Sequence, residues 1–395
     1  MSKRRACIIA AGVADFGVRQ AHVVDLFQEA AKRCLDDIPG LNHKDIDGIL
    51  VATSLAGRSS SQTNTAPVVA ERLGLKPTSI CTRVDTLCAG GNSGILLAKA
   101  LVESGMSDMV MVTGAEKMYT PERWETFYTE LTVAEHDWDC AHGMGLPPAF
   151  FALQAKEHMK YYGTTKEQLA AVSVTNYNFG SVNPTAHFQK KITMEEVLEA
   201  RPIVPPLTLY DCCPITDGAA ATIIAVEEKA KELSDRPLVY IRGGAQVLLH
   251  SVSANFPGGR FGDWPNLRLA AEKAYKNAKV GPDDIDVANI HDCFTISEII
   301  EVEELGFCKK GEGGPYVASG QINIGGKVPV NTDGGLISCG HPFGATGIRQ
   351  ATELLKQLQG RATFQVEGAE IGLAHNLSGY CTEQTIVIYG KEPVN

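Results

Sequence analysis

The two halves of this chain resemble each other, and this internal duplication constrains its fold more than any other feature of the sequence. The segment C-A-G-G-N-S-G-I begins at Cys88, and the segment H-P-F-G-A-T-G-I begins at His341. A glycine follows six residues after each of them, at Gly94 and Gly347, and each is followed by a helical pattern. The match places a cysteine and a histidine at corresponding positions of the two halves.

A second pair of matching segments lies upstream of these positions. Residues 45–47 read D-I-D, and residues 284–286 also read D-I-D, each after a helical pattern that contains two adjacent alanines. Two matches in the same order predict a duplicated α/β unit, with a reactive residue at the strand-to-helix turn of each copy. The alternative is a structural repeat whose turns carry no chemistry.

Short apolar runs alternate with helical patterns along both halves, which is typical of an α/β protein. Irregular sequence and two helical patterns interrupt this alternation at 119–204. We therefore expect an N-terminal half made of 1–118 plus 205–232, an inserted loop domain at 119–204, and a C-terminal half at 233–395. Expected strands are 6–11, 48–53, 109–114, 219–226, 238–242, 286–291, 362–366, 370–375 and 384–389, and expected helices include 267–278, 295–305 and 345–359.

The composition limits the classes of partner that we expect. The 395 residues carry a formal net charge of -10, whereas nucleic-acid binding needs a basic surface. No apolar run approaches the roughly 20 residues that span a bilayer, so we expect a cytoplasmic protein without a membrane segment. The cysteines include no C-x-x-C pair, so they predict neither a disulfide framework nor a zinc-binding motif.

Cys88 has the setting of a nucleophile. It follows a β-like run that ends at Val84 and precedes a glycine-rich turn, so its sulfur is expected near the start of a helix over 95–103. The N–H groups and the dipole at a helix N-terminus favour an anion, which lowers the pKa of a thiol and provides donors for an oxyanion. The alternative is a buried structural cysteine beside glycines that are needed for packing.

His341 occupies the corresponding turn of the second half, between Gly340 and Pro342. A helix N-terminus disfavours the imidazolium form, so this histidine is expected to stay neutral. A neutral imidazole near Cys88 can accept the thiol proton and thereby activate the sulfur. The alternative is a capping or core histidine.

The sequence H-D-C-F begins at His291, where a strand that starts at Asp286 is expected to end. Catalytic groups of α/β sheets gather at the carboxyl ends of strands, so His291 is a candidate donor to a carbonyl that becomes an enolate. Cys293 is a candidate for moving a proton, because the pKa of a thiol can be tuned to near neutrality. The alternative for Cys293 is a packing residue.

Four motifs together resemble the thiolase superfamily over nearly the whole chain. They are V-D-T-L-C-A-G-G-N-S-G around Cys88, Y-D-C-C-P-I-T-D-G-A-A-A at 210–221, N-I-H-D-C-F at 289–294 and N-T-D-G-G-L-I-S-C-G-H-P-F-G-A-T-G at 331–347. The H-D-C-F motif stands in place of the N-E-A-F-like sequence of the main thiolase group. In this it resembles the sterol-carrier-protein-2-type and archaeal-type branch.

This resemblance implies the thiolase fold, in which two duplicated αβαβα halves form a five-layered structure with an inserted loop domain. It implies a homodimer assembled through the first half. It also implies ping-pong chemistry with coenzyme A as a substrate and no covalently bound cofactor. By the same resemblance Cys88 is the acylated nucleophile, activated by His341, and His291 stabilises the thioester enolate. Backbone N–H groups at Cys88 and near Gly379 form the other oxyanion hole.

One position departs from the pattern of many thiolases, which carry a second catalytic cysteine in a C-x-G sequence near the C-terminus. Here the corresponding stretch reads H-N-L-S-G-Y, with Leu377 at the position of the cysteine and Asn376 as its polar neighbour. The resemblance to the H-D-C-F branch transfers the proton-moving role to Cys293. Cys339 and Cys381 are weaker candidates.

The inserted segment is short for a loop domain that must cover coenzyme A alone. Archaeal-type relatives work with a small zinc-bearing OB-fold protein, so the resemblance implies a separate zinc-containing subunit that completes the coenzyme A site. Zinc would then belong to the partner, because the sequence shows no set of zinc ligands in this chain.

We interpret the chain as an acyl-CoA C-acyltransferase that cleaves a 3-oxoacyl-CoA with coenzyme A or catalyses the reverse Claisen condensation. Acetoacetyl-CoA is the generic substrate, and a bulkier aromatic or dicarboxylic one such as benzoylsuccinyl-CoA rests on analogy with two-component thiolases. One alternative is an acyltransferase to a phenolic or polyketide-like acceptor, which does not need Cys293. Another is a non-catalytic protein that binds acyl-CoA or lipid, which needs neither a thiol nor its base.

Overall fold

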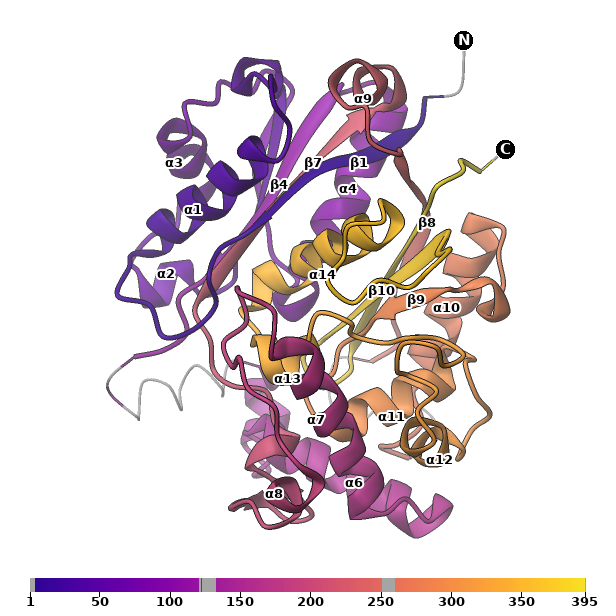
Figure 1. Cartoon of the computed structure of the whole chain (residues 1–395). Helices are drawn as coiled ribbons and strands as arrows, with labels where there is room; N and C mark the ends of the chain where they lie inside the picture. Colours follow the sequence, from indigo (N-terminus) through magenta and orange to yellow (C-terminus); the bar gives the residue numbers. More distant parts are fainter. Residues whose placement is uncertain (1–3, 121, 123–132, 251–259, 395) are drawn as a thin grey trace.

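A mixed sheet of nine strands runs through the chain. In the computed structural model, which describes residues 4–120, 122, 133–250 and 260–394, the strand order is β3-β2-β4-β7-β1-β8-β11-β10-β9 (Figure 1). A separate pair consists of β5 (Pro202–Val204) and β6 (Leu207–Thr208). The nine strands are β1 (Ala6–Val13), β2 (Gly48–Ala52), β3 (Ile80–Val84), β4 (Met109–Glu116), β7 (Gly218–Val226), β8 (Val239–Leu248), β9 (Val287–Asn289), β10 (Ile371–Ser378) and β11 (Glu383–Gly390).

The order of the strands is itself duplicated. From the centre of the sheet outward, β1-β7-β4-β2-β3 in the first half corresponds to β8-β11-β10-β9 in the second. Where the first half has β3, the second half has a parallel bridge between Ala288 of β9 and Val330. The two halves of the sheet meet at the antiparallel pairing of β1 with β8.

The matching D-I-D segments have the same structural role in both halves. The carboxylate of Asp47 accepts hydrogen bonds from the N–H groups of Asp108 and Met109, at 2.8 and 3.2 Å, where β4 begins. The carboxylate of Asp286 accepts two from the N–H groups at the start of β10, at 2.8 and 2.9 Å. The duplication predicted from the sequence is therefore present in the fold.

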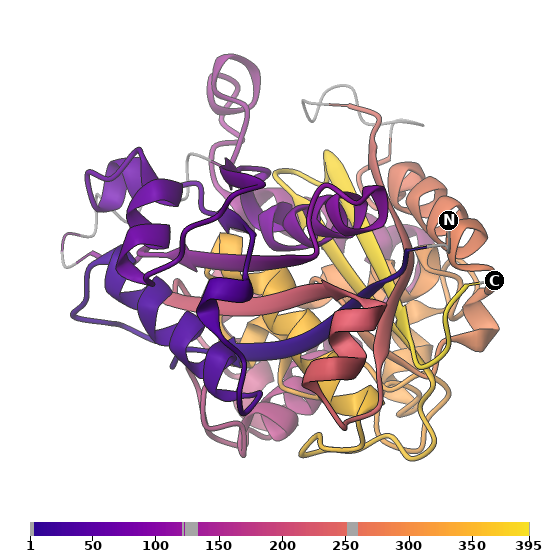
Figure 2. The same cartoon turned by 90° about the horizontal axis from the view of Figure 1, so that it is seen from above.

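Helices cover the outer faces of the sheet and fill the space between its two halves. The helices α4 (Gly90–Ser104) and α14 (Phe343–Leu358) pack against each other in the centre, while α1 (Val23–Asp36) packs on β1 and β7 and α10 (Pro265–Ala278) on β8 and β11. Figure 2 shows the amber α14 between the indigo-to-purple strands and the yellow strands. This layering confirms the expected α/β fold class. The other α-helices of the described residues are α2 (Ala56–Ser59), α3 (Thr65–Arg72), α6 (Pro147–Tyr162), α7 (Lys166–Gly180), α8 (Met194–Leu198), α9 (Glu227–Leu233), α11 (Thr295–Glu304), α12 (Gly313–Ala318) and α13 (Gly335–Cys339).

The two central helices approach each other closely at glycines. A Cβ atom added at Gly91 would lie 2.9 Å from the backbone nitrogen of Ile348, and one added at Gly347 would lie 2.5 Å from the backbone nitrogen of Asn92. Only glycine permits such an approach between two backbones. Since Cys88 lies just before α4 and His341 just before α14, this crossing brings the two matching turns together.

The strand expected over 362–366 is wrong, because these residues form a bend in irregular backbone. The side-chain amide of Gln357 takes the place of a neighbouring strand there. It donates to the carbonyl oxygen of Phe364 at 2.6 Å and accepts from the N–H of Val366 at 2.9 Å. The other expected strands and helices are present with shifted ends, and α6 and α7 confirm the two helical patterns expected within the insertion.

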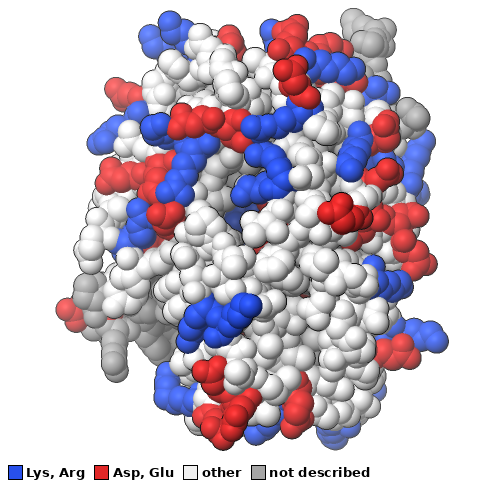
Figure 3. Space-filling view, viewed as in Figure 1, with Lys and Arg blue, Asp and Glu red and all other residues white. Residues whose placement is uncertain are grey.

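Charges of both signs are interspersed on the face of the molecule shown in Figure 3. Several charged side chains of the described residues form ion pairs at the surface, such as Lys32 with Asp36 at 2.5 Å. Among the described residues, no helix has both the length and the apolar character that crossing a membrane requires.

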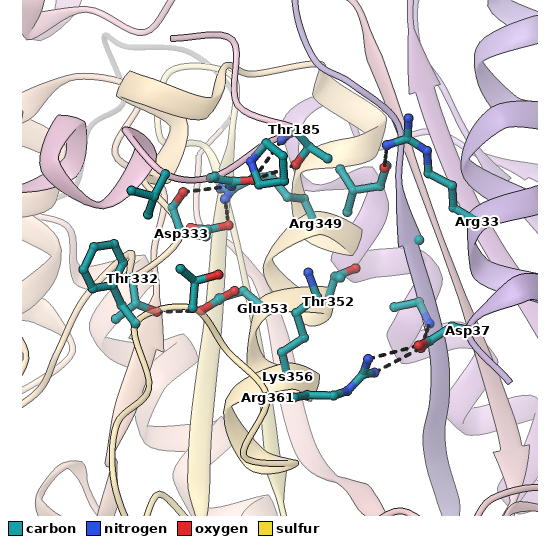
Figure 4. Close-up of a pocket in the computed structure, with 18 of the residues that line it drawn as sticks. Arg33, Asp37, Thr185, Thr332, Asp333, Arg349, Thr352, Glu353, Lys356 and Arg361 are labelled. Carbon is teal, nitrogen blue, oxygen red and sulfur yellow. Dashed lines mark hydrogen bonds and ion pairs between the residues drawn. The ribbon is translucent and has the colours of Figure 1, made fainter. Parts of the chain in front are cut away.

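A polar hollow of about 440 Å³ lies where α1, α14 and the segment after α7 meet (Figure 4). Within it the guanidinium of Arg361 donates to both carboxylate oxygens of Asp37, at 3.0 Å each, and Arg349 pairs with Asp333. Asp37 also accepts a hydrogen bond of 2.8 Å from Arg236. The contacts of Asp37 tie the end of α1 in the first half of the chain to the second half.

Replacement of Asp37 by asparagine is expected to lower the free energy of unfolding by about 1–3 kcal/mol at pH 7, because charge-assisted hydrogen bonds are lost. Burial raises the pKa of the Asp37 carboxyl, but hydrogen bonds from Arg361 and Arg236 outweigh it and hold the pKa below its ordinary value. This contribution is present above the unfolded-state pKa and disappears as the pH falls through the folded-state pKa.

Urea denaturation followed by circular dichroism measures this effect. The matched control is Asp36→Asn, since the Asp36 side chain is 62% exposed and its pair with Lys32 lies at the surface. We expect the control to change stability by less than about 0.5 kcal/mol. If both variants lost the same free energy of unfolding, the proposal that the ion pairs of Asp37 stabilise the fold would be contradicted.

Candidate active site

One apolar pocket contains the four reactive residues expected from the sequence. Its volume is about 460 Å³, and Cys88, His291, Cys293 and His341 all line it. It lies beyond the carboxyl ends of β3, β9 and β10, where catalytic groups of α/β sheets gather. Much of the remaining wall is apolar and includes Met118, Leu146, Pro147, Phe151, Ile203, Phe294, Phe343 and Leu377.

Three of these residues converge on one point. The sulfur of Cys88 and one ring nitrogen from each of His291 and His341 all lie within 4.8 Å of one another. The two imidazole rings are perpendicular, with centroids 4.7 Å apart. None of the three side chains is more than 5% exposed. The two matching turns and the H-D-C-F motif therefore form a single buried cluster, as the sequence predicted.

The hydrogen bonds of His341 determine which of its nitrogens is free. Its Nδ1 lies 2.8 Å from the hydroxyl oxygen of Thr346, and that hydroxyl donates its own proton to the carbonyl oxygen of Pro342 at 3.0 Å. The hydroxyl oxygen must therefore accept from Nδ1–H. The lone pair of His341 is then on Nε2, the nitrogen that can accept a proton from a nearby thiol.

His291 has the opposite arrangement. Its Nδ1 lies 3.2 Å from Nδ2 of Asn376, and an amide nitrogen can only donate, so Nδ1 carries the lone pair. The proton of His291 is then on Nε2, which is buried and has no hydrogen-bond partner among the described residues. An unpartnered ring N–H in the pocket is suited to donate to an oxyanion.

Both histidines are neutral at pH 7. Burial, with a smaller contribution from the positive charge of Arg349, lowers the pKa of His341 to about 3. Burial and the neighbouring His341, His375 and Arg349 lower the pKa of His291 well below its ordinary value. The expectation of a neutral His341 is met, and its main cause is burial.

Cys293 lies in the same pocket and is 5% exposed. Its sulfur is 3.5 Å from the hydroxyl of Ser297, and burial raises the pKa of its thiol well above the ordinary value. This cysteine therefore holds its proton at neutral pH and can give it to a strongly basic carbanion.

The other residues that the sequence predicted for the site differ in their position relative to the pocket. Gly379 lines the pocket, whereas Asn376 lies behind His291 and also donates to Gln350 at 2.8 Å. Neither of the weaker cysteine candidates is among the lining residues: the thiol of Cys339 donates to a carbonyl at 3.0 Å, and Cys381 accepts a hydrogen bond from an amide at 3.7 Å.

Several supporting residues were missed from the sequence. Asp292 accepts hydrogen bonds from the N–H groups of Leu336 and Ile337, at 2.7 and 3.1 Å, and so joins the H-D-C-F turn to α13, which leads to His341. Glu301 accepts the backbone N–H of His291 at 2.8 Å. Asp292 lies inside a quoted motif, but its partners become visible only in the folded chain. Two further thiols, Cys212 and Cys213, also line the pocket.

Comparison with known proteins identifies the family. A sequence model described as "Thiolase, N-terminal domain" matches residues 6–228, and one described as "Thiolase C-terminal domain-like" matches residues 264–391. The chain is 40% identical to an acetyl-CoA acetyltransferase of Methanothermobacter thermautotrophicus, over 93% of this chain and 94% of that protein. The chain belongs to the thiolase family.

This thiolase also resembles members of the branch expected from its H-D-C-F motif. It is 33% identical to sterol carrier protein 2 of Gallus gallus, over 95% of this chain and 70% of that protein. Among solved structures, it superimposes with a TM-score of 0.85 on a chain of the "Ltp2-ChsH2(DUF35) aldolase", at 25% identity and with 99% of each chain covered. The family and these relatives make this thiolase an acyl-CoA acyltransferase.

Proposed function

We propose that this thiolase cleaves a 3-oxoacyl-CoA with coenzyme A, or catalyses the reverse Claisen condensation, through an acyl-enzyme on Cys88. The observation that carries the proposal is the convergence of four groups in one apolar pocket. They are a thiol, a neutral base with a free nitrogen, an unpartnered ring N–H and a second, protonated thiol.

In the first half-reaction, Nε2 of His341 takes the thiol proton of Cys88, and the thiolate attacks the 3-oxo carbon. Backbone N–H groups at Cys88 and Gly379 stabilise the resulting oxyanion. The bond between C2 and C3 then breaks and leaves an acyl group on Cys88. The departing acetyl-CoA enolate is stabilised by Nε2–H of His291 and takes its proton at carbon from the thiol of Cys293.

In the second half-reaction, the thiolate of Cys293 removes the proton of the incoming coenzyme A thiol. The coenzyme A sulfur attacks the acyl carbon, and the bond between this carbon and the sulfur of Cys88 breaks. The imidazolium of His341 returns its proton to Cys88, which restores all groups to their starting states. The same steps in reverse give the Claisen condensation.

Replacement of Thr346 by valine is expected to slow acylation on the order of 10-fold, because a lost hydrogen bond worth about 1–1.5 kcal/mol no longer fixes the tautomer of His341. The side chain of Thr346 is fully buried and valine has its shape. Rapid-mixing kinetics with an acyl-CoA measures the acylation rate directly.

Thr352→Val is the matched control, since Thr352 is a buried threonine on the same helix whose hydroxyl donates to the carbonyl oxygen of Ile348 at 2.9 Å. We expect normal acylation in this control and in Thr346→Ser, which retains the hydroxyl. If Thr346→Val and Thr352→Val lost the same fraction of the acylation rate, Thr346 would have a packing role only.

The walls of the pocket favour a substrate with an uncharged acyl group. Its described lining contains many apolar side chains and no lysine or arginine that would pair with a second carboxylate. We therefore propose acetoacetyl-CoA or a larger apolar 3-oxoacyl-CoA as substrate, ahead of a dicarboxylic one such as benzoylsuccinyl-CoA. Relatives named acetyl-CoA acetyltransferase support the smaller substrate.

A partner subunit remains part of this proposal. The similar aldolase structure has a DUF35 protein in its name, which supports a partner subunit for this thiolase as well. We propose that this partner is a small zinc-bearing OB-fold protein, as the resemblance to archaeal-type relatives implies. We also propose a homodimer. Among the described residues β3 is the outermost strand of the first half, and its residues Cys81 and Thr82 are exposed, so this edge is available to a second copy.

The alternatives fit the pocket less well. Transfer to a phenolic acceptor does not require a second thiol beside the nucleophile, yet Cys293 lies in the pocket. Binding alone requires neither the thiol of Cys88 nor a free nitrogen on His341. The arrangement therefore favours cleavage or formation of a carbon–carbon bond.

Thiolysis assays test the proposed function. The purified protein, alone and as the native complex from its source, would be mixed with coenzyme A and a series of 3-oxoacyl-CoA substrates. We expect loss of the 3-oxoacyl-CoA and formation of two shorter thioesters. Binding of substrates without turnover by either preparation would contradict the proposal.

A further inference from the structure

We propose that the pocket also forms a reversible zinc site, in which Cys88, His341 and His291 bind the ion and block the reactive thiol. The inhibition rests on the function proposed above, whereas the binding of the ion rests on the geometry alone. This site differs from the zinc of the proposed partner, because its three ligands belong to this chain. No single sequence motif indicates this site, since its ligands come from three separate motifs.

The ligand atoms are close to the spacing that zinc requires. With Zn–S near 2.3 Å and Zn–N near 2.0–2.1 Å, ligand atoms of a tetrahedral site lie roughly 3.3–3.8 Å apart. Here all three atoms lie within 4.8 Å of one another. Side-chain rotations that move these atoms by about 1 Å are therefore enough to reach the spacing of a zinc site. The pocket leaves the fourth position to water or to a thiol of the substrate.

The donor set selects a soft or borderline metal. One thiolate and two imidazoles suit Zn²⁺, whereas Mg²⁺ and Ca²⁺ prefer oxygen ligands. Binding displaces the thiol proton of Cys88, which leaves to solvent as the Zn–S bond forms. His341 is ready to bind, because its Nδ1–H already donates to Thr346 and its Nε2 lone pair is free.

His291 must change tautomer to bind the ion. Its Nε2 carries a proton while Nδ2 of Asn376 donates to Nδ1. Metal binding moves this proton to Nδ1, and the Asn376 amide must then turn so that Oδ1 accepts it. This oxygen is buried and has no hydrogen-bond partner among the described residues. Asn376 therefore sets the balance between His291 as an enolate donor and His291 as a metal ligand.

Cobalt substitution tests the binding without any assay of activity. The chelator-treated protein would be titrated with Co²⁺, whose thiolate charge-transfer band and tetrahedral visible bands report the ligand set. We expect one Co²⁺ per chain with a thiolate band that Zn²⁺ removes. The band should be absent in Cys88→Ala and retained in Cys81→Ser, which lacks an exposed thiol. No band in the wild type, or loss of the band only in Cys81→Ser, would overturn the site.

Two substitutions at Asn376 test the coupling to His291. Asn376→Asp presents only acceptors to Nδ1, so it should raise the Co²⁺ affinity by at least about 10-fold while it slows turnover. Asn376→Ala should raise the affinity less. Equal affinity in the wild type and in Asn376→Asp would remove His291 from the ligand set.

Zinc inhibition links the site to the reaction. Zn²⁺ should inhibit thiolysis reversibly, a chelator should restore activity, and prior acylation of Cys88 should prevent Co²⁺ binding. If the protein shows the thiolate band but no thiolysis, the metal site is supported and the proposed function is contradicted. If the protein cleaves 3-oxoacyl-CoA but shows no band, the proposed function is supported and the metal site is contradicted.

Discussion

Replacement of Cys88 by alanine is expected to reduce the turnover of a 3-oxoacyl-CoA by about 10⁴- to 10⁶-fold, the range found when a catalytic nucleophile is removed. The sulfur lies at the point where the two central helices begin, within 4.8 Å of one ring nitrogen of each of His291 and His341. Steady-state thiolysis kinetics measures the loss.

Cys34→Ala is the matched control for this prediction. Cys34 is a fully buried thiol on α1, outside the pocket, so its replacement removes a buried sulfur without touching the reacting groups. We expect the control to retain activity within a few-fold. If Cys88→Ala retained turnover comparable to the control, the acyl-enzyme mechanism would be excluded.

Replacement of Cys293 by alanine is expected to slow cleavage of the carbon–carbon bond by about 10²- to 10⁴-fold, the usual contribution of a general acid. Acylation of Cys88 by a simple acyl-CoA should change far less. The reason is the leaving group: a thiolate with a pKa near 8.5 departs without a proton, whereas the enolate carbon is strongly basic. Thiolysis rates and acyl-enzyme yields, measured on the same variant, separate the two steps.

Cys213→Ala provides the control for Cys293, because Cys213 is another thiol that lines the same pocket. Its N–H donates to the carbonyl oxygen of Cys293 at 3.0 Å, a backbone contact that alanine retains. We expect this control to remain active. A large loss in Cys213→Ala together with normal thiolysis in Cys293→Ala would transfer the proton-moving role to Cys213.

Local features of the sequence were enough to predict which residues meet in the pocket. The match between the turns at Cys88 and His341 predicted their proximity, because duplicated α/β units place corresponding turns at corresponding sheet edges. The same holds for His291 at the end of β9. The contact between Gly91 and Ile348 shows why the glycines are needed, which the pattern alone did not reveal.

Contacts between distant segments could not be predicted in this way. The tautomer of His341 depends on the direction in which the Thr346 hydroxyl donates, and that of His291 depends on an amide of β10. The irregular segment 362–366 was taken for a strand because its apolar residues resemble one. Its backbone groups are hydrogen-bonded instead by the side-chain amide of Gln357, which belongs to α14. The cluster of three possible metal ligands likewise has no sequence signature.

The most direct test of the central claim is intact-protein mass spectrometry after incubation with acetoacetyl-CoA and with longer apolar 3-oxoacyl-CoA substrates. The mechanism predicts that the wild-type chain gains the mass of one acyl group, and that added coenzyme A removes it. It also predicts that Cys88→Ala gains none. A wild-type chain that turns over substrate without any adduct, or an adduct that persists in Cys88→Ala, would contradict the assignment of Cys88 as the nucleophile.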